Sequence, residues 1–191
     1  MKTVFSKYLV LLNLILITIS CKSQTLPLNT LMDNIPQGAY VKDLNNELAP
    51  YIGTYKANYK GNEITLFIVK EENRPTNRIT KTFFRDALSI KYIVKNSSGL
   101  VLQDTSNGNF PNIKLFSLGV NSNDNSVTFH YSGTNCRVGW GSINLKKLNS
   151  TQLSWEYYPN SRIITDATCP PGTDTTVYLP VTDDELIFTK Q

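Results

Sequence analysis

Short segments that alternate between apolar and polar residues recur along most of this chain, and clusters of turn residues separate them. From Tyr51 onward roughly nine or ten such segments follow one another, each about as long as a β-strand. Lys60-Gly61-Asn62 and Asn149-Ser150 are examples of the turns between them. Long helical periodicity is absent, and strands do not alternate with helices. The sequence therefore predicts an all-β, antiparallel fold.

The order of the segments favours pairing between neighbours. YIGTYKANY and NEITLFIVK flank a turn and are predicted to form a hairpin. EENRPTN is expected to be a charged loop, with separate strands over ITKTFFRD and LSIKYIVK. Because strands adjacent in sequence usually pair, a meander is favoured over a Greek key. We expect a lipocalin-like, up-and-down barrel or half-barrel.

The first twenty residues are typical of an export signal and not of a folded element. Lys2 and Lys7 precede an apolar run that ends at Ile19, and Ser20 stands before Cys21. The run is short for a membrane span, which needs about 20 residues. A cysteine at the cleavage point is typical of bacterial lipoproteins. Cys21 is therefore predicted to be acylated and to anchor the chain to a membrane.

Three regions follow from this pattern. Residues 1–20 are a lipoprotein signal peptide, residues 21–50 are a tether and lead-in with short helical turns, and residues 51–191 are a single β domain. The formal net charge of +4 includes the two signal-peptide lysines, and no basic block occurs elsewhere. Nucleic acid is therefore not an expected partner.

Two cysteines remain once Cys21 is acylated. Cys136 and Cys169 lie in loop-like sequence and are predicted to form a disulfide, which an envelope compartment favours. The alternatives are a redox pair or metal ligands, but there is no CxxC motif and no histidine nearby. His130 is the only histidine, and no nucleophile motif accompanies it. We expect no catalytic residue, no metal site and no cofactor.

Aromatic residues are the candidate binding residues. Tyr51, Tyr55 and Tyr59 share one face of a predicted strand, and Trp155 and Tyr157 share a face of another. If these faces line an open barrel, they form an apolar cavity with hydroxyl groups for a small amphipathic ligand. If the barrel interior is filled, the same residues pack the core.

Five segments resemble a family of small lipoproteins of uncharacterised function from flavobacterial-type Bacteroidota: CKSQTLPLNTL, IPQGAYVKDLNNELAPYIGTYKA, NCRVGWG, LNSTQLSWEYYP and YLPVTDDELIFTK. The resemblance spans nearly the whole chain after the signal and implies no activity or catalytic residue. It also implies that acidic residues after the lipidated cysteine mark surface-exposed members. Lys22, Ser23 and Gln24 stand there instead, which favours an outer-membrane position facing the periplasm.

The sequence predicts a non-enzymatic envelope lipoprotein that binds a small apolar or amphipathic ligand. The alternative is a protein–protein interaction module, such as an inhibitor, an immunity-type lipoprotein or an assembly factor. An enzyme remains a third hypothesis, which needs polar groups converging in a cleft.

Overall fold

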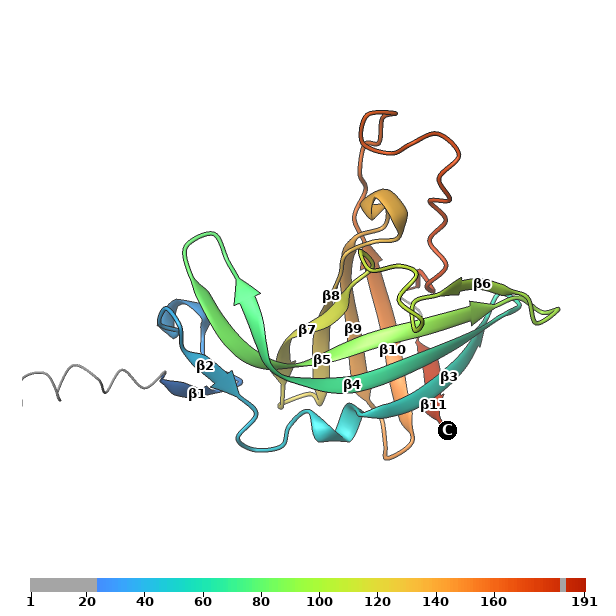
Figure 1. Cartoon of the computed structure of the whole chain (residues 1–191). Helices are drawn as coiled ribbons and strands as arrows, with labels where there is room; N and C mark the ends of the chain where they lie inside the picture. The colour runs from blue at the N-terminus through green and yellow to red at the C-terminus, as the bar shows by residue number, and fades with distance from the viewer. Residues whose placement is uncertain (1–23, 183–184) are drawn as a thin grey trace, which may run out of the picture.

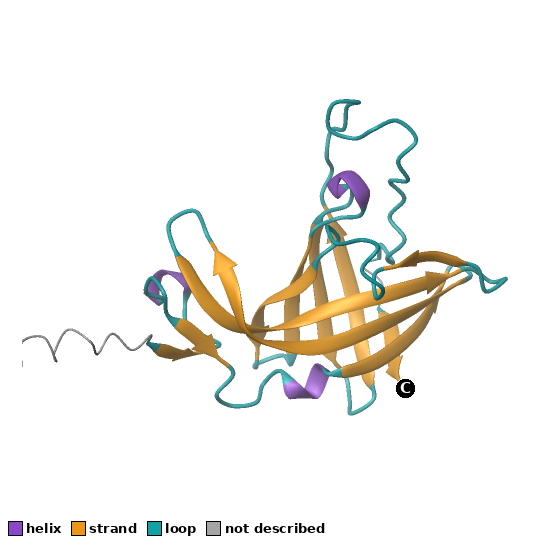
Figure 2. Cartoon of the chain, in the orientation of Figure 1, coloured by secondary structure: helices purple, strands orange, loops and turns teal. Residues whose placement is uncertain are grey.

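A closed barrel of eight antiparallel strands forms the body of the molecule, shown in a computed structural model that describes residues 24–182 and 185–191 (Figure 1). The barrel strands are β3 (Gly53–Tyr59), β4 (Asn62–Asn77), β5 (Thr82–Lys95), β7 (Leu115–Asn121), β8 (Ser126–Tyr131), β9 (Gly141–Lys147), β10 (Gln152–Pro159) and β11 (Leu186–Lys190). Three further strands lie outside the barrel: β2 (Tyr40–Lys42) and β6 (Val101–Asp104) pair with β5, and β1 (Thr25–Pro27) pairs with β2. Short 3₁₀ helices connect some of the strands: η1 (Met32–Asn34), η2 (Ala49–Tyr51) and η3 (Asn135–Arg137) (Figure 2).

The strand order confirms the predicted all-β meander. Around the barrel the order is β5-β4-β3-β11-β10-β9-β8-β7, and each neighbouring pair is antiparallel. The pairing of Ser89 on β5 with Phe116 on β7 closes the circle. The predicted lipocalin-like barrel is therefore present as a closed barrel and not as a half-barrel.

The hairpin between β3 and β4 follows directly from the sequence. Lys60 and Gly61 both have positive φ, at 49° and 81°, which a tight two-residue hairpin turn of the primed kind requires. Tyr55 and Ala57 on β3 and Ile64, Leu66 and Ile68 on β4 then point to the same buried side. One apolar face per strand thus fills the barrel interior.

β4 and β5 are longer than expected. The run EENRPTN, which was predicted to be a loop, continues β4 to Asn77, and the two strands expected over 79–95 are one continuous β5. A bulge between Glu71 and Arg74 interrupts the register, and Asn73 within it has a φ of 52°. Beyond the bulge the β4–β5 hairpin extends out of the barrel wall (Figure 1).

The segment predicted as a tether and lead-in is largely built into the same sheet. β1 pairs in parallel with β2, and β2 pairs in parallel with β5 at Tyr40–Phe84 and Val41–Arg85. Five apolar residues of this segment are buried in the hydrophobic core: Leu28, Ile35, Ala39, Val41 and Leu48. The predicted short helical turns are present as η1 and η2. No helix in the described part of the chain is long and apolar enough to cross a membrane.

Segments outside the strands cover the barrel interior. Tyr51, at the end of η2, is buried beside the turn that joins β7 to β8. Between β10 and β11, residues 160–182 form no helix or strand, but Leu179 is buried in the core and Val177 packs against it. The side chains of the barrel interior are therefore shielded from solvent.

Candidate functional site

The predicted aromatic binding residues lie mainly in the packed interior. Tyr55 on β3 and Trp155 and Tyr157 on β10 are 1%, 0% and 2% exposed, and Tyr51 from η2 is 3% exposed. Tyr59 is half-buried at the end of β3, where its hydroxyl donates a hydrogen bond to the carbonyl of Val181 at 2.8 Å. Four of the five residues thus share the core, and the fifth lies near its edge.

Ring contacts join the aromatic residues of β10 to their neighbours. The Trp155 ring lies 5.4 Å from that of Phe188 and 6.5 Å from that of Tyr157, measured between centroids. Tyr157 meets Tyr131 edge-to-face at 5.7 Å, and its hydroxyl donates to the carbonyl of Gly139. The indole Nε1 of Trp155 donates to the carbonyl of Pro180 at 2.9 Å. These contacts are those of a core whose polar groups are paired with the backbone.

A chain of polar side chains crosses the interior between β5, β6 and β8. Tyr92 donates to the Gln103 side-chain oxygen at 2.6 Å, and the Tyr92 and Tyr131 hydroxyls are 3.1 Å apart. The Gln103 amide nitrogen donates to Thr134 at 3.1 Å. Burial raises the pKa of both tyrosines well above the usual range, so their hydroxyls stay protonated. The network pairs the buried polar groups with one another. Its tyrosines stay neutral and so carry no charge that could bind a ligand.

A ligand inside the barrel would have to displace these side chains. Interior cores are packed to near-crystalline density, so room for even a small molecule requires several side chains to move. The assignment of the five aromatic residues to ligand binding stays a prediction.

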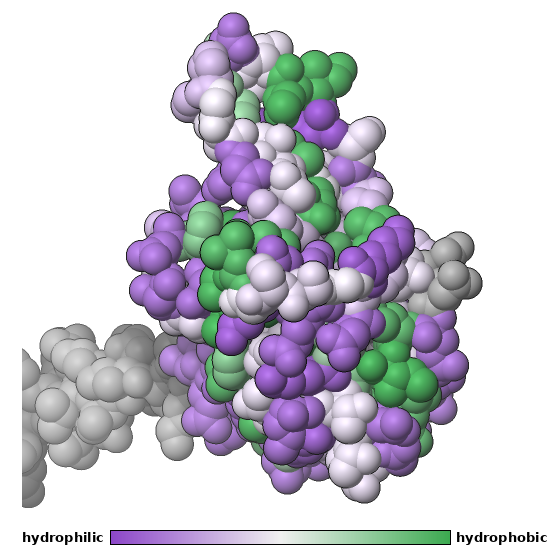
Figure 3. Space-filling view, turned by 90° about the vertical axis from the view of Figure 1, so that its right-hand side faces the viewer, coloured by the Kyte–Doolittle hydropathy of each residue, from purple (hydrophilic) through white to green (hydrophobic). Residues whose placement is uncertain are grey.

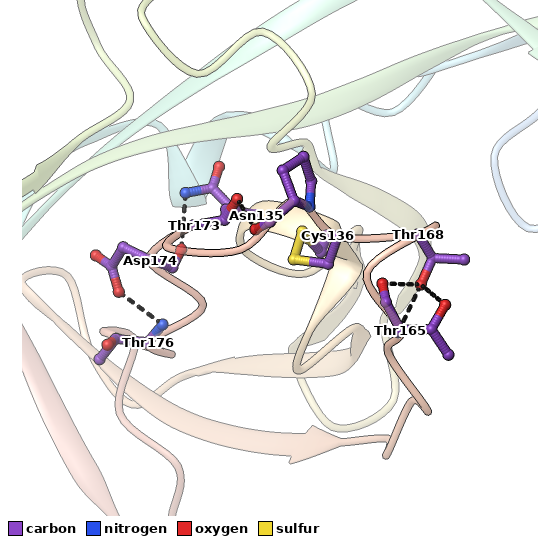
Figure 4. Close-up of a disulfide and its surroundings, with 9 residues drawn as sticks. Asn135, Cys136, Thr165, Thr168, Thr173, Asp174 and Thr176 are labelled. Carbon is purple, nitrogen blue, oxygen red and sulfur yellow. Dashed lines mark hydrogen bonds between the residues drawn. A yellow bond between two sulfur atoms is a disulfide. The ribbon is translucent and has the colours of Figure 1, made fainter.

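The predicted disulfide is present. Cys136 in η3 and Cys169 in the β10–β11 connection are joined, with their Cα atoms 5.4 Å apart. Around it, the Asn135 side chain donates to the carbonyl of Asp174 at 2.9 Å, and the Asp174 carboxylate accepts from the backbone of Thr176 (Figure 4). The bond therefore ties the long β10–β11 connection to the turn between β8 and β9.

Two buried carboxylates hold the N-terminal segment to β4 and β5. Asp86 accepts hydrogen bonds from the Tyr40 hydroxyl at 2.5 Å and from the backbone of Asp43 and Asn73 at 3.0 and 3.1 Å. Lys70 lies 3.1 Å from the Asp43 carboxylate and 3.7 Å from that of Asp86. Burial, followed by the hydrogen bond to Asp86, raises the pKa of Tyr40 to about 12. The donors around both carboxylates indicate a structural network.

The outside of the barrel carries a cleft of mixed chemistry, which we call the amphipathic cleft. It has a volume of about 300 Å³ and lies between β4, β5 and the connection from β6 to β7. Its apolar lining includes Phe110, Pro111, Ile113 and Phe116, and its charged lining is Glu71, Arg74, Lys91 and Lys114. The volume is within the range of small-molecule sites.

A second cleft adjoins the first along β7, and we call it the arginine cleft. Its volume is about 230 Å³, and its charged lining consists of Arg74, Arg78, Arg85 and Lys114. The Arg74 guanidinium lies 3.9 Å from the centre of the Phe116 ring, and its Nε contacts the Glu71 carboxylate at 3.1 Å. Arg74, Lys114 and Phe116 line both clefts.

His130 lies on the outer face of β8. Its ring meets that of Phe116 edge-to-face at 5.4 Å. Burial, and then the charges of Arg137 and Arg78, lower the pKa of His130, so the ring is neutral at pH 7. Within residues 24–182 and 185–191, no group of three or more histidine, cysteine, aspartate or glutamate residues is placed to hold a metal ion.

The charged residues of the two clefts were not found from the sequence. Arg74 belongs to a run that reads as a loop, and Arg85 belongs to a strand with no obvious partner. Their pairing register places them directly opposite each other. The pairing of Arg74 with Arg85 can be inferred only when β4 is known to continue past its bulge. The acyl site predicted at Cys21 and the signal peptide lie outside the described residues.

Comparisons with known proteins give a family but no function. The chain belongs to the DUF6705 family of unknown function, which it matches over residues 1–191. No curated protein and no solved structure matches the chain.

Proposed function

We propose, for this member of a family of unknown function, that the chain is a non-enzymatic binding module that a lipid on Cys21 holds at the outer membrane, facing the periplasm. Its ligand is a small amphipathic molecule, and the amphipathic cleft is its binding site. The observation that carries this proposal is the contrast between a barrel interior occupied by one cluster of buried side chains and a cleft on the outside of the wall.

The lining of the amphipathic cleft matches an amphipathic ligand. Phe110, Pro111 and Ile113 offer apolar surface from the β6–β7 connection, while Lys91 on β5 and Lys114 carry positive charge. Sites for small molecules commonly combine apolar walls with a few charged groups that fix orientation. A ligand with an apolar body and a polar end would satisfy both parts of this lining.

The non-enzymatic part rests on the surroundings of His130. Among the described residues its ring has an aromatic neighbour, Phe116, and no side-chain hydrogen bond to a hydroxyl or a carboxylate. In a nucleophile–base pair, the base hydrogen-bonds to the hydroxyl or thiol that it activates and is oriented by a third group. The Asp43 and Asp86 carboxylates are occupied by backbone and tyrosine donors, which favours a structural role over catalysis.

The test is binding of Nile red, a neutral fluorophore, to the detergent-free chain that begins after Cys21. We expect a blue-shifted emission that Phe110→Ala abolishes, because Phe110 supplies apolar wall to the cleft. Ile187→Ala is the matched control, since this apolar side chain is 40% exposed on β11, across the barrel. Equal binding by the wild type and Phe110→Ala would refute the assignment of the cleft.

A second candidate function is protein–protein interaction through the β10–β11 connection. Ile163 and Ile164 in this segment are 90% and 42% exposed, and Figure 3 shows hydrophobic surface near the top of the molecule, where the segment projects. Exposed apolar surface on a projecting segment is typical of interaction sites. A photo-crosslinker at position 163 in intact cells should capture one reproducible protein. A crosslinker at Ser161 should capture the same protein more weakly, and failure at both positions excludes this candidate.

A further inference from the structure

Arg85 is a buried cation without a buried counter-ion. The residue is 7% exposed on β5, and its Nη1 donates to the carbonyl of Leu118 on β7 at 2.5 Å. No described group accepts a hydrogen bond from its Nε, and no described carboxylate forms a salt bridge with it. Buried polar atoms without a partner are uncommon in folded proteins and call for a specific reason.

The neighbours of Arg85 add positive charge. Arg74 on β4 is directly opposite Arg85 in the antiparallel pair, an arrangement that is unfavourable for two like charges. Arg78 and Lys114 complete the charged lining of the arginine cleft, and this lining includes no aspartate or glutamate. The nearby Glu71 contacts Arg74 from the amphipathic cleft. Burial lowers the pKa of Arg85, and the charges of Arg78 and Arg74 lower it further.

We propose that the arginine cleft binds an oxyanion, a phosphate or carboxylate group, that pairs with Arg85 and Arg74. Guanidinium groups present planar hydrogen-bond donors that match the oxygens of such groups. Leu118 engages Nη1, so the Nε edge of Arg85 is the donor edge for the anion. The anion offsets the repulsion between the two arginines and gives Nε an acceptor.

The proposed function does not assign this site, because the amphipathic cleft is a separate volume, although the two share part of their lining. The oxyanion has two possible sources. β2, close to the chain's N-terminal end, pairs with β5 at Val41–Arg85, so Arg85 lies next to the N-terminal segment. Figure 1 shows β1 and β2 beside the projecting part of β4 and β5. A phosphate on a lipid headgroup and a free phosphate present the same oxygens, so both could pair with Arg85 and Arg74.

The test is NMR titration of the ¹⁵N-labelled full chain in neutral detergent, following the Arg85 Nε–Hε resonance. Inorganic phosphate should shift this resonance saturably, while chloride at equal ionic strength should leave it unchanged. Arg78→Ala should weaken phosphate binding about 2–5-fold, the effect of removing one exposed charge. Arg162→Ala removes another exposed arginine, from the β10–β11 connection, and should have no effect.

Arg85→Gln should abolish the binding, and because this variant lacks the Arg85 resonance, the backbone amide of Leu118, which also lines the arginine cleft, is followed instead. Because Arg85 is buried, thermal unfolding must first show that the Arg85→Gln variant is folded. If that variant is not folded, the comparison of Arg78→Ala with Arg162→Ala decides the test. Equal shifts with chloride and phosphate, or equal effects of Arg78→Ala and Arg162→Ala, would overturn the proposal.

A second arm identifies the source of the anion. Vesicles of phosphatidylglycerol in phosphatidylcholine are compared with phosphatidylcholine alone and with free phosphate. A response to free phosphate that the vesicles do not exceed supports a soluble ligand, and a stronger response to phosphatidylglycerol supports a headgroup. No response in either arm overturns the site. Phe110→Ala should lose Nile red binding and keep phosphate binding, because Phe110 lines only the amphipathic cleft. A wild type that binds phosphate but not Nile red counts against the proposed function and not against this site.

Discussion

Asp86 joins three segments of the chain through one carboxylate. It accepts hydrogen bonds from Tyr40 and Asp43 in the N-terminal segment and from Asn73 in the β4 bulge. Burial alone would raise its pKa, but these hydrogen bonds and the charge of Lys70 outweigh burial and lower the pKa below the usual 3.8. The charged form of Asp86 therefore stabilises the fold.

We predict that Asp86→Asn lowers the free energy of unfolding by about 1–3 kcal/mol at pH 7, since the amide leaves part of the buried network unpaired. A carboxyl group whose pKa is lowered on folding contributes fully above its unfolded pKa and loses this contribution as the pH falls through its folded value. The difference in free energy of unfolding between wild type and Asp86→Asn should therefore narrow below about pH 4. Urea unfolding at pH 7, 4 and 3 measures it.

The matched control is Asp166→Asn, which changes an exposed carboxylate in the β10–β11 connection. It should have little effect at any of these pH values. A constant difference between Asp86→Asn and wild type across this pH range would contradict the role assigned to the charged form.

At the scale of elements, the barrel strands were largely predictable and the β4–β5 extension was not. The β3–β4 hairpin follows from a turn sequence and alternating apolar residues, which are local signals. The extension beyond Glu71 depends on distant contacts: Phe84 pairs with Tyr40 of β2, and Phe83 is buried. A charged run with a proline reads as a loop unless that distant partner is known. The clefts beside the extension were missed for the same reason.

The β10–β11 connection behaves as a structural element although it lacks helices and strands. Gly139, before β9, has a φ of 69°, and a Cβ built there would lie 2.6 Å from a Val177 methyl and 2.9 Å from the Tyr157 hydroxyl oxygen. The turn before β9 and the returning connection therefore meet at a contact that has no room for a side chain.

We predict that Gly139→Ala destabilises the protein by about 1–3 kcal/mol more than Gly172→Ala, because overpacking adds to backbone strain. Gly172 is the matched control: its φ is 80°, and a Cβ there meets nothing within 4 Å. Both changes share the strain of positive φ, so the difference isolates the close contact. Thermal unfolding of the two variants with the disulfide intact measures this difference, and equal melting temperatures would show that the connection does not pack on Gly139.

For the whole molecule, the sequence predicted the fold class from local patterns, and the membrane anchor from a segment outside the described structure. The structure limits the distance between the predicted acyl site at Cys21 and the start of the sheet. β1 begins at Thr25, and the carbonyl of Gln24 already accepts a hydrogen bond from the backbone of Tyr40. Residues 22–24 span at most about 10 Å when extended. A lipid on Cys21 would therefore hold the sheet close to the membrane surface.

We predict that Cys21→Ala abolishes incorporation of labelled palmitate in the native host and moves the chain out of the membrane fraction. Acyl chains supply the apolar burial that anchors such a protein, and no helix in the described part of the chain can replace them. Cys136→Ser is the control, because it removes a cysteine and the disulfide but keeps the acyl site. It should still incorporate palmitate. If Cys21→Ala stays in the membrane fraction at its mature size, something other than lipid holds this protein there, and the headgroup source of the oxyanion loses its support.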